Sequence, residues 1–149
     1  MNMIRKATVD DSSRIAEILI FTKRVNYRSI FRNDKVSFGM MQVYPLAKEY
    51  IDDPAKLENI WVYDDEFVKG MIHIEGDLIE ELYIDSFFVN EGIGSKLIEF
   101  AIQEKGCTKV KVLEKNTNAI RFYERHGFKA TGHKEVWPGT SEYVIDMAS

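Results

Sequence analysis

Hydrophobic residues recur along the chain in short alternating or continuous runs, and these runs predict strands. Residues such as Gly, Asp and Pro separate most of the runs, as is typical of turns between strands. The seven predicted strands are residues 4–8, 60–63, 67–74, 78–88, 109–113, 128–136 and 142–147. Short turns join three neighbouring runs in the first half, which predicts hairpins and therefore antiparallel pairing there.

Apolar residues at helical spacing predict four helices between these strands. The first helix follows a group of N-cap residues at 10–13. Residues 26–50 show a looser pattern, which predicts a second helical region with a break near Pro45. The methionine and aromatic side chains of this region are typical of ordinary core packing.

The last two predicted helices have clear ends. Residues 92–105 place their apolar side chains on one face, and Gly106 stands where a left-handed C-cap glycine belongs. Asn116 caps a helix that runs to His126, and Gly127 closes it. The resulting order, β-α-α-β-β-β-α-β-α-β-β, predicts an α/β (α+β) fold with a mixed sheet flanked by helices.

The composition sets limits on the class of protein. With 149 residues we expect a single domain, residues 1–149. A net charge of −4 argues mildly against a nucleic-acid or anionic-membrane partner, because both favour a basic surface. No apolar run suits a signal peptide or a membrane span, so we expect a cytoplasmic protein. Cys107 is the single cysteine, so we expect neither an internal disulfide nor a metal site.

A Gly-Ile-Gly turn at residues 92–94 joins a predicted strand to a predicted helix. Glycines let the backbone approach a ligand closely, and the free N–H groups at a helix start favour a phosphate. A Rossmann fingerprint requires a third glycine where Leu97 stands, and the Gly-Lys-Ser/Thr run of a P-loop does not occur. The tripeptide alone leaves two interpretations open, a pyrophosphate site and a tight turn without ligand.

Two motifs in the same order make the chain resemble a known family. Strand residues 82–84 lead into the Gly-x-Gly turn, which is similar to the acetyl-CoA motif of the GCN5-related N-acetyltransferases (GNAT superfamily). Residues 116–128 resemble the second motif of that family, with Asn116, Tyr123 and Gly127 in matching places. The resemblance covers essentially the whole chain. It implies a mostly antiparallel sheet of about seven strands with about four helices, splayed at the strand before the Gly-x-Gly turn.

The resemblance implies an acetyl-CoA-dependent N-acetyltransferase, in which a primary amine attacks the thioester directly within a ternary complex. Acetyl-CoA would be the cosubstrate, and backbone amides of the loop would hold its pyrophosphate. The acceptor would be a small-molecule amine or a protein amine, and a homodimer is left open. The positions matching the family's coenzyme contacts are Leu82, Tyr83, Ile84, Val89, Asn90, Glu91, Gly92, Ile93, Gly94, Ser95, Lys96, Asn116 and Tyr123.

The resemblance also implies roles in the chemistry. Tyr123 would be the general acid toward the coenzyme sulfur, since a phenol with a pKa of about 10 is comparable to a thiolate in basicity. In some relatives a Glu on the strand before the turn acts as the general base, and Glu80 and Glu81 lie in that region here. Neighbouring strand residues point to opposite faces, so only one of the two is expected to face the acceptor. His73 and a water-relayed proton transfer are the alternatives.

Two positions depart from the family pattern. Val89 stands where the family has Arg or Gln, and Glu91 adds negative charge to a loop meant for phosphate. Lys96, Arg121 and Arg125 would offset this charge if they reach the phosphates, and solvated helix charges are the alternative for each.

Two other classes of function therefore stay open. One is a non-catalytic acyl-CoA-binding sensor, and the other is a partner-binding α/β domain without a coenzyme. We expect residues 26–50 and the turn at 137–140 to line the acceptor pocket. The aromatic side chains there favour a small molecule with apolar parts, and they are Tyr27, Phe31, Phe38, Tyr44 and Trp137.

Overall fold

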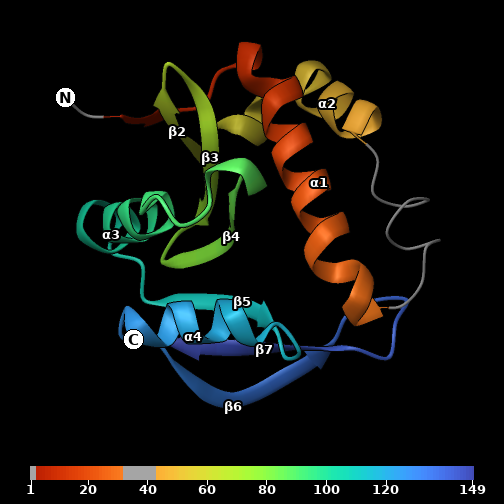
Figure 1. Cartoon of the computed structure of the whole chain (residues 1–149), viewed down its shortest axis with the longest axis vertical. Coiled ribbons are helices and arrows are strands. Elements are labelled where there is room, and N and C mark those ends of the chain that lie inside the picture. The colour runs from red at the N-terminus through yellow and green to blue at the C-terminus, as the bar shows by residue number, and fades with distance from the viewer. Residues whose placement is uncertain (1–2, 32–42) are drawn as a thin grey trace.

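The computed structural model describes residues 3–31 and 43–149 (Figure 1). The strands form one sheet in the order β1-β2-β3-β4-β5-β7-β6. They are β1 (Ile4–Lys6), β2 (Ile60–Asp65), β3 (Phe67–Glu75), β4 (Leu78–Ile84), β5 (Lys109–Leu113), β6 (Lys129–Val136) and β7 (Tyr143–Ala148). The helices are α1 (Ser12–Phe31), α2 (Val43–Asp52), α3 (Ile93–Lys105) and α4 (Thr117–Arg125). The predicted order of elements is confirmed.

The sheet is mixed and mostly antiparallel, as predicted. β4 and β5 pair in parallel, and the other neighbouring strands pair antiparallel. Short turns connect β2, β3 and β4, whereas α3 makes the crossover that a parallel pair requires. Figure 1 shows the two groups of strands, β1 to β4 above and β5 to β7 below, with α1 alongside both.

The strand predicted at residues 78–88 ends at Ile84. Asp85 begins a short 3-10 turn, Ser86–Phe88, and its carboxylate accepts a hydrogen bond from the Phe87 N–H at 2.9 Å. Side-chain acceptors of this kind compete with the strand ladder for backbone N–H groups. The chain therefore leaves the sheet before it reaches the glycine loop.

The region predicted as a second helix, residues 26–50, belongs to two helices. Its first part is the end of α1, and its last part is most of α2. Pro45 lies in the first turn of α2, where the N–H groups have no intrahelical acceptor, so it begins a helix there and does not mark a break. Residues 32–42 lie outside the described residues.

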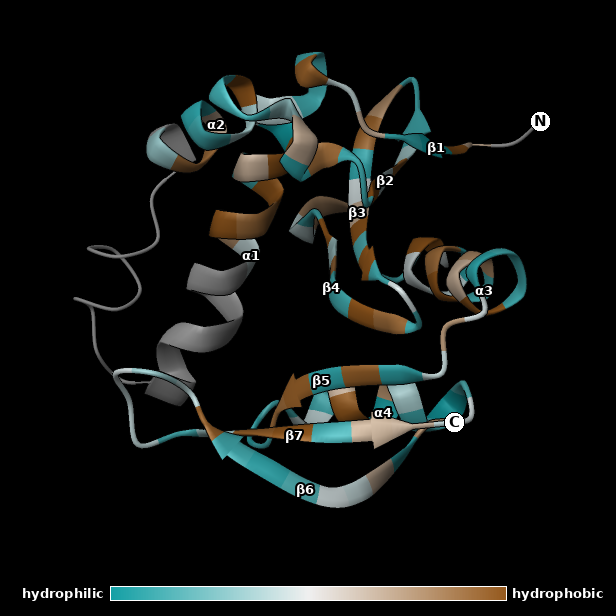
Figure 2. Ribbon diagram, turned by 180° about the vertical axis from the view of Figure 1, so that it is seen from behind, coloured by the Kyte–Doolittle hydropathy of each residue, from teal (hydrophilic) through white to brown (hydrophobic). Residues whose placement is uncertain are grey.

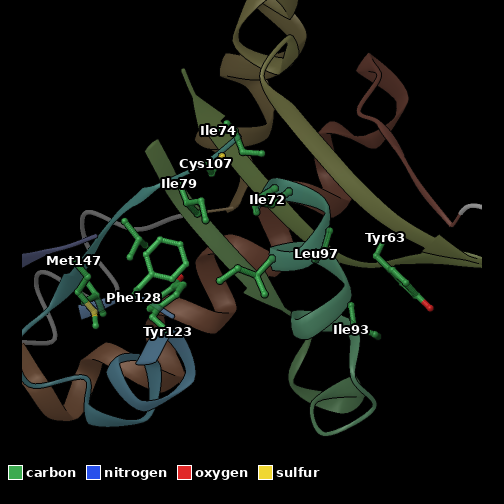
Figure 3. Packing of buried hydrophobic residues seen from close by; sticks show 14 residues of the cluster. Tyr63, Ile72, Ile74, Ile79, Ile93, Leu97, Cys107, Tyr123, Phe128 and Met147 are labelled. Carbon is green, nitrogen blue, oxygen red and sulfur yellow. The ribbon is translucent and has the colours of Figure 1, made fainter. Parts of the chain in front are cut away.

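Each face of the sheet buries its own set of apolar side chains. On the face covered by α3 and α4, Leu97 and Phe128 are fully buried, and Figure 3 shows them with their neighbours. On the face covered by α1 and α2, Ile15 and Met71 are fully buried. By contrast, every residue of the edge strand β6 is exposed, and Figure 2 shows this strand mostly in teal and white. Burial on both faces holds the central strands in place.

Candidate active site

β4 and β5 run together at their first residues and then separate. Their parallel pairing consists of Leu78 with Lys109 and Ile79 with Val110. Beyond these two pairs, a cleft of about 1140 Å³ lies between the strands. This volume is slightly above the usual range of about 300–1,000 Å³ for small-molecule and cofactor sites. The splay predicted at the strand before the glycine loop is therefore confirmed.

Both halves of the sheet and α4 line this cleft. β4 contributes residues 80–84, and β5 contributes residues 111–113. Thr22 of α1, together with Trp137 and Pro138 after β6, lines it as well. The aromatic residues Tyr27, Phe31, Phe38 and Tyr44, which the sequence suggested for an acceptor pocket, have side chains outside the described residues.

Glu80 is an extra residue in β4. The register of β3 with β4 places His73 opposite Glu81 and Ile74 opposite Ile79, so the pairing skips Glu80. Such a bulge breaks the alternation of faces. The cleft runs along the whole edge of residues 80–84, so both glutamates border it, and the bulge interrupts the regular alternation that the sequence analysis assumed for them.

The two glutamates have different surroundings. The Glu81 side chain is 23% exposed and lies beside His73 of β3. Glu80 is exposed at the bulge. The neighbouring carboxylate of Glu81, and then that of Glu75, raises the pKa of His73 although burial opposes the change. Glu81 therefore has an ionisable neighbour close to its carboxylate, whereas no such contact involves Glu80 within the part of the chain that the structure describes.

The loop between β4 and α3 presents its backbone to the cleft end. Asn90 and Gly92 are left-handed, with φ of 69° and 82°, and Gly92 is the N-cap of α3. The first N–H groups of α3 have no intrahelical acceptor and suit an anion. Arg14 of α1 anchors the loop start through an ion pair with Asp85 at 2.6 Å and a hydrogen bond to the Val68 carbonyl at 2.8 Å.

Substituting Gly92 with alanine is expected to lower the free energy of unfolding by about 1–2 kcal/mol, the cost of a left-handed side-chain-bearing residue. No heavy atom of the described residues lies within 4 Å of the added Cβ, so the cost is conformational. Gly94→Ala is the matched control, because its Cβ would lie 3.4 Å from the Phe122 ring, an ordinary contact. We expect no loss for this control in urea denaturation, and equal losses for both variants would contradict the argument.

The start of α3 packs against α4. Ser95 Oγ lies 3.3 Å from His126 Nε2 at the end of α4. The Phe122 ring lies next to Gly94 and is tilted against the His126 ring, with centroids 4.8 Å apart. The glycine loop and α4 therefore meet at one end of the cleft.

Residues 91–96 of the predicted coenzyme set do not line the cleft wall itself. Ile93 is 3% exposed and belongs to the core, so only its backbone is available to a ligand. Lys96 Nζ lies 3.3 Å from the Tyr63 hydroxyl and over that ring. The structure thus holds Lys96 against β2, away from the cleft where the sequence suggested a phosphate contact.

Tyr123 faces the cleft from α4 and is held by aromatic neighbours. It is 7% exposed, and its ring centroid lies 5.3 Å from that of Phe122 and 5.9 Å from that of Phe128, both edge-on. Figure 3 shows Tyr123 and Phe128 side by side. Asn116 caps α4 by accepting a hydrogen bond from the Ala119 N–H at 3.3 Å, and it also lines the cleft. Capping and ligand contact are therefore compatible for Asn116.

Basic side chains line the part of the cleft near α4. Arg121 and Arg125 lie there, as the sequence suggested for phosphate contacts. Lys111 and Lys115 were not suggested, but they line it as well. The alternation of polar and apolar residues along β5 could have indicated that the Lys111 side chain is exposed, because its two neighbours on the strand are buried. Lys115 Nζ is oriented by Glu142 Oε2 at 3.0 Å.

Two other kinds of site are absent from the part of the chain that the structure describes. No helix in residues 3–31 or 43–149 is long and apolar enough to cross a membrane. Within the same ranges, no cluster of His, Cys, Asp and Glu is large enough to hold a metal ion. Cys107 is buried, and this burial raises the pKa of its thiol.

Comparison with known proteins gives consistent similarities. The acetyltransferase (GNAT) domain model matches residues 56–130, about half of the chain. The peptidyl-lysine N-acetyltransferase YjaB of Salmonella typhimurium is 33% identical over 91 residues, which cover 60% of this chain and 63% of that protein. The spermine/spermidine N(1)-acetyltransferase of Bacillus subtilis is 26% identical over 108 residues, which cover 68% of this chain and 57% of that protein. This chain thus spans less than two thirds of the length of both relatives.

Solved structures support the fold assignment. The crystal structure of the PaiA N-acetyltransferase from Thermoplasma acidophilum in complex with coenzyme A has a TM-score of 0.69 to this chain. The two sequences are 17% identical, and the superposition covers 98% of each chain. At this identity the similarity concerns the fold alone.

Proposed function

Because the chain belongs to the acetyltransferase (GNAT) family, we propose that it transfers the acetyl group of acetyl-CoA to a primary amine. The observation that carries this proposal is the separation of β4 from β5 after Ile79, which turns the edge of residues 80–84 toward the cleft. An extended ligand with amide groups can pair with such an edge like an added strand. The pantetheine arm of acetyl-CoA has this chemistry.

The loop between β4 and α3, together with α4, suits the pyrophosphate end of acetyl-CoA. The first N–H groups of α3 would hold the pyrophosphate, aided by the left-handed Asn90 and Gly92. Arg121 and Arg125 line the adjacent part of the cleft and carry the charge to offset that of the phosphates. Acetyl-CoA is the acetyl donor typical of the family, and we propose it as the donor for this chain as well.

The proposed reaction is a direct attack within the ternary complex. The amine nitrogen bonds to the acetyl carbon as the carbon–sulfur bond breaks. The amine proton passes to Glu81, and the leaving thiolate takes the phenolic proton of Tyr123. We prefer Glu81 over Glu80 as the base, because its side chain is 23% exposed on the face that α1 and α2 cover, whereas Glu80 is exposed at the bulge. Transfer by water alone is the alternative.

We propose a cationic amine as the acceptor, either a protein lysine or a polyamine. Glu80, Glu81 and Glu135 place carboxylates along the cleft, which attract a protonated amine before it loses its proton. The relatives supply the two acceptor classes, since one is a peptidyl-lysine and the other a spermine/spermidine acetyltransferase.

Release of free thiol from acetyl-CoA tests the proposal. The acceptor panel contains lysine peptides, spermidine and spermine, and the same amines in N-acetylated form control for simple hydrolysis. We expect release with at least one free amine and none with its blocked form. Coenzyme binding without release would favour an acyl-CoA sensor. The absence of any thermal shift with saturating acetyl-CoA would favour a partner-binding domain, since a tight ligand stabilises by about 2–4 kcal/mol.

Val89→Gln is expected to tighten acetyl-CoA binding by about three- to tenfold, or roughly 1 kcal/mol. Val89 lines the cleft and is 49% exposed, so an amide side chain there can donate to a phosphate oxygen. Val89→Leu adds no donor and should leave the Kd unchanged. Titration calorimetry measures both variants, and weaker binding by Val89→Gln would mean that the loop has another geometry when it is occupied.

A further inference from the structure

Three ionisable side chains follow one another from the cleft to the exposed end of β3. Glu81 lines the cleft, and His73 lies directly opposite it on β3, with Nδ1 3.8 Å from Glu81 Oε1. His73 Nε2 lies 2.8 Å from Oε1 of Glu75. The Asn59 amide donates to both Glu75 oxygens, at 3.2 and 3.1 Å, and holds the outer carboxylate in place.

We propose that His73 is a positioning residue that carries the amine proton from Glu81 to Glu75 and so to water. This inference rests on the proposed function, with Glu81 as the base. Glu81 takes the proton that the amine loses as the nitrogen–carbon bond forms. Neutral His73 accepts that proton at Nδ1 and releases the proton on Nε2 to Glu75, which exchanges it with solvent. Glu81 is then a carboxylate again, and His73, now protonated at Nδ1, regains a proton on Nε2 and loses the one on Nδ1 by exchange with water before the next turnover.

A proton can leave the site along these side chains because the last of them, Glu75, is the most exposed to solvent. The Glu81 side chain is 23% exposed within a cleft that coenzyme and acceptor would fill together, so its own access to water is limited during turnover. The Glu75 side chain is 49% exposed and lies outside the cleft lining. His73 lies between them, and its two ring nitrogens let it accept on one side while it donates on the other.

The charged groups around His73 determine the pH at which the relay operates. Within the described residues, Glu81 on β4 and Glu75 on its own strand face the ring, and both raise the pKa of His73 above its ordinary value of 6.5. Beyond Glu81, α2 brings the buried Tyr50, whose pKa is raised by burial and then by the charges of Glu81 and Glu49, so it stays neutral. The relay requires neutral imidazole. Therefore kcat should rise with pH through the raised pKa of His73.

The dependence of kcat on pH tests the relay in the full chain, by thiol release with the best amine of the panel. His133→Gln is a matched control, because His133 Nε2 lies 3.0 Å from Glu135 Oε1 two residues along an exposed strand, in the same pattern as His73 and Glu75. We expect His73→Gln to lower kcat at pH 7 about tenfold, less than the 10²- to 10⁴-fold typical of a direct acid or base. The acid-side inflection should disappear, while His133→Gln and the Kd for acetyl-CoA stay unchanged.

Glu75→Gln provides a second variant at an exposed position. It removes the outer proton acceptor of the relay and one of the two charges that raise the pKa of His73, so kcat should fall and the remaining inflection should move to lower pH. Wild-type kcat and inflection in His73→Gln would overturn the relay and leave acetyl transfer intact. A lower kcat with the inflection still present would assign His73 a structural role and overturn the relay equally. A wild-type chain that releases no thiol with any amine overturns the proposed function and the relay together.

Discussion

Replacing Tyr123 with phenylalanine is expected to lower kcat by about 10²- to 10³-fold, the range for loss of one general acid. The ring is 7% exposed and packs edge-on against Phe122 and Phe128, so phenylalanine can keep its place. The variant then lacks only the hydroxyl that would protonate the leaving thiolate. Because this proton moves in the transition state, the Kd for acetyl-CoA should stay within about twofold.

Tyr143→Phe is the control for this measurement. Tyr143 is 39% exposed on β7 and does not line the cleft, so removal of its hydroxyl should leave kcat at the wild-type value. Steady-state rates and calorimetric Kd values for both variants separate chemistry from binding. Unchanged turnover in Tyr123→Phe would remove Tyr123 from the mechanism. A parallel loss of coenzyme binding would instead assign its hydroxyl to coenzyme contact.

Phe128→Ala is expected to lower the free energy of unfolding by about 3–5 kcal/mol, as is typical of a large aromatic side chain removed from a core. Phe128 is fully buried and lies between α4 and β6, in the cluster that also contains Leu97 and Met147. The surrounding strands and helices cannot close around the cavity without moving. Its ring also packs against Tyr123, so the variant should show a lower kcat at temperatures where it remains folded.

Phe87→Ala is the matched control for Phe128→Ala, since Phe87 is 88% exposed. Urea denaturation of both variants should give a large loss for the buried residue and a change within about 0.5 kcal/mol for the exposed one. A loss below about 1 kcal/mol at Phe128 would contradict the packing described for this face of the sheet.

Local features of the sequence were sufficient for the elements and for the family. Strand alternation and helical spacing repeat within a few residues, so they identify the described strands and the helices α1, α3 and α4, whereas the region predicted as the second helix also included the end of α1. Capping signals are equally local: Asn116 caps α4, and Gly106 ends α3 with a φ of 66°. The Gly-x-Gly turn and the later Asn and Tyr positions indicate the GNAT family, which the matching domain model confirms. A single domain, a cytoplasmic location and a homodimer stay predictions.

The site depends on contacts between residues that are far apart in the sequence. The alternation rule suggested that only one of Glu80 and Glu81 faces the acceptor, but that rule assumes a regular strand, and the pairing with β3 places a bulge at Glu80. Lys96 could be a phosphate contact or a solvated charge from its sequence alone. Its position against Tyr63 follows from how α3 packs on β2 and β3.

The sequence by itself determined the order of strands and helices, many of their ends and the family they indicate, because these properties depend mostly on neighbours within about one helical turn. Only the tertiary structure decided that β4 and β5 separate after two pairs, that Glu81 lies beside His73 and that Tyr123 lines the same cleft. These are distances between elements, and they depend on sheet register and core packing, which no local pattern contains.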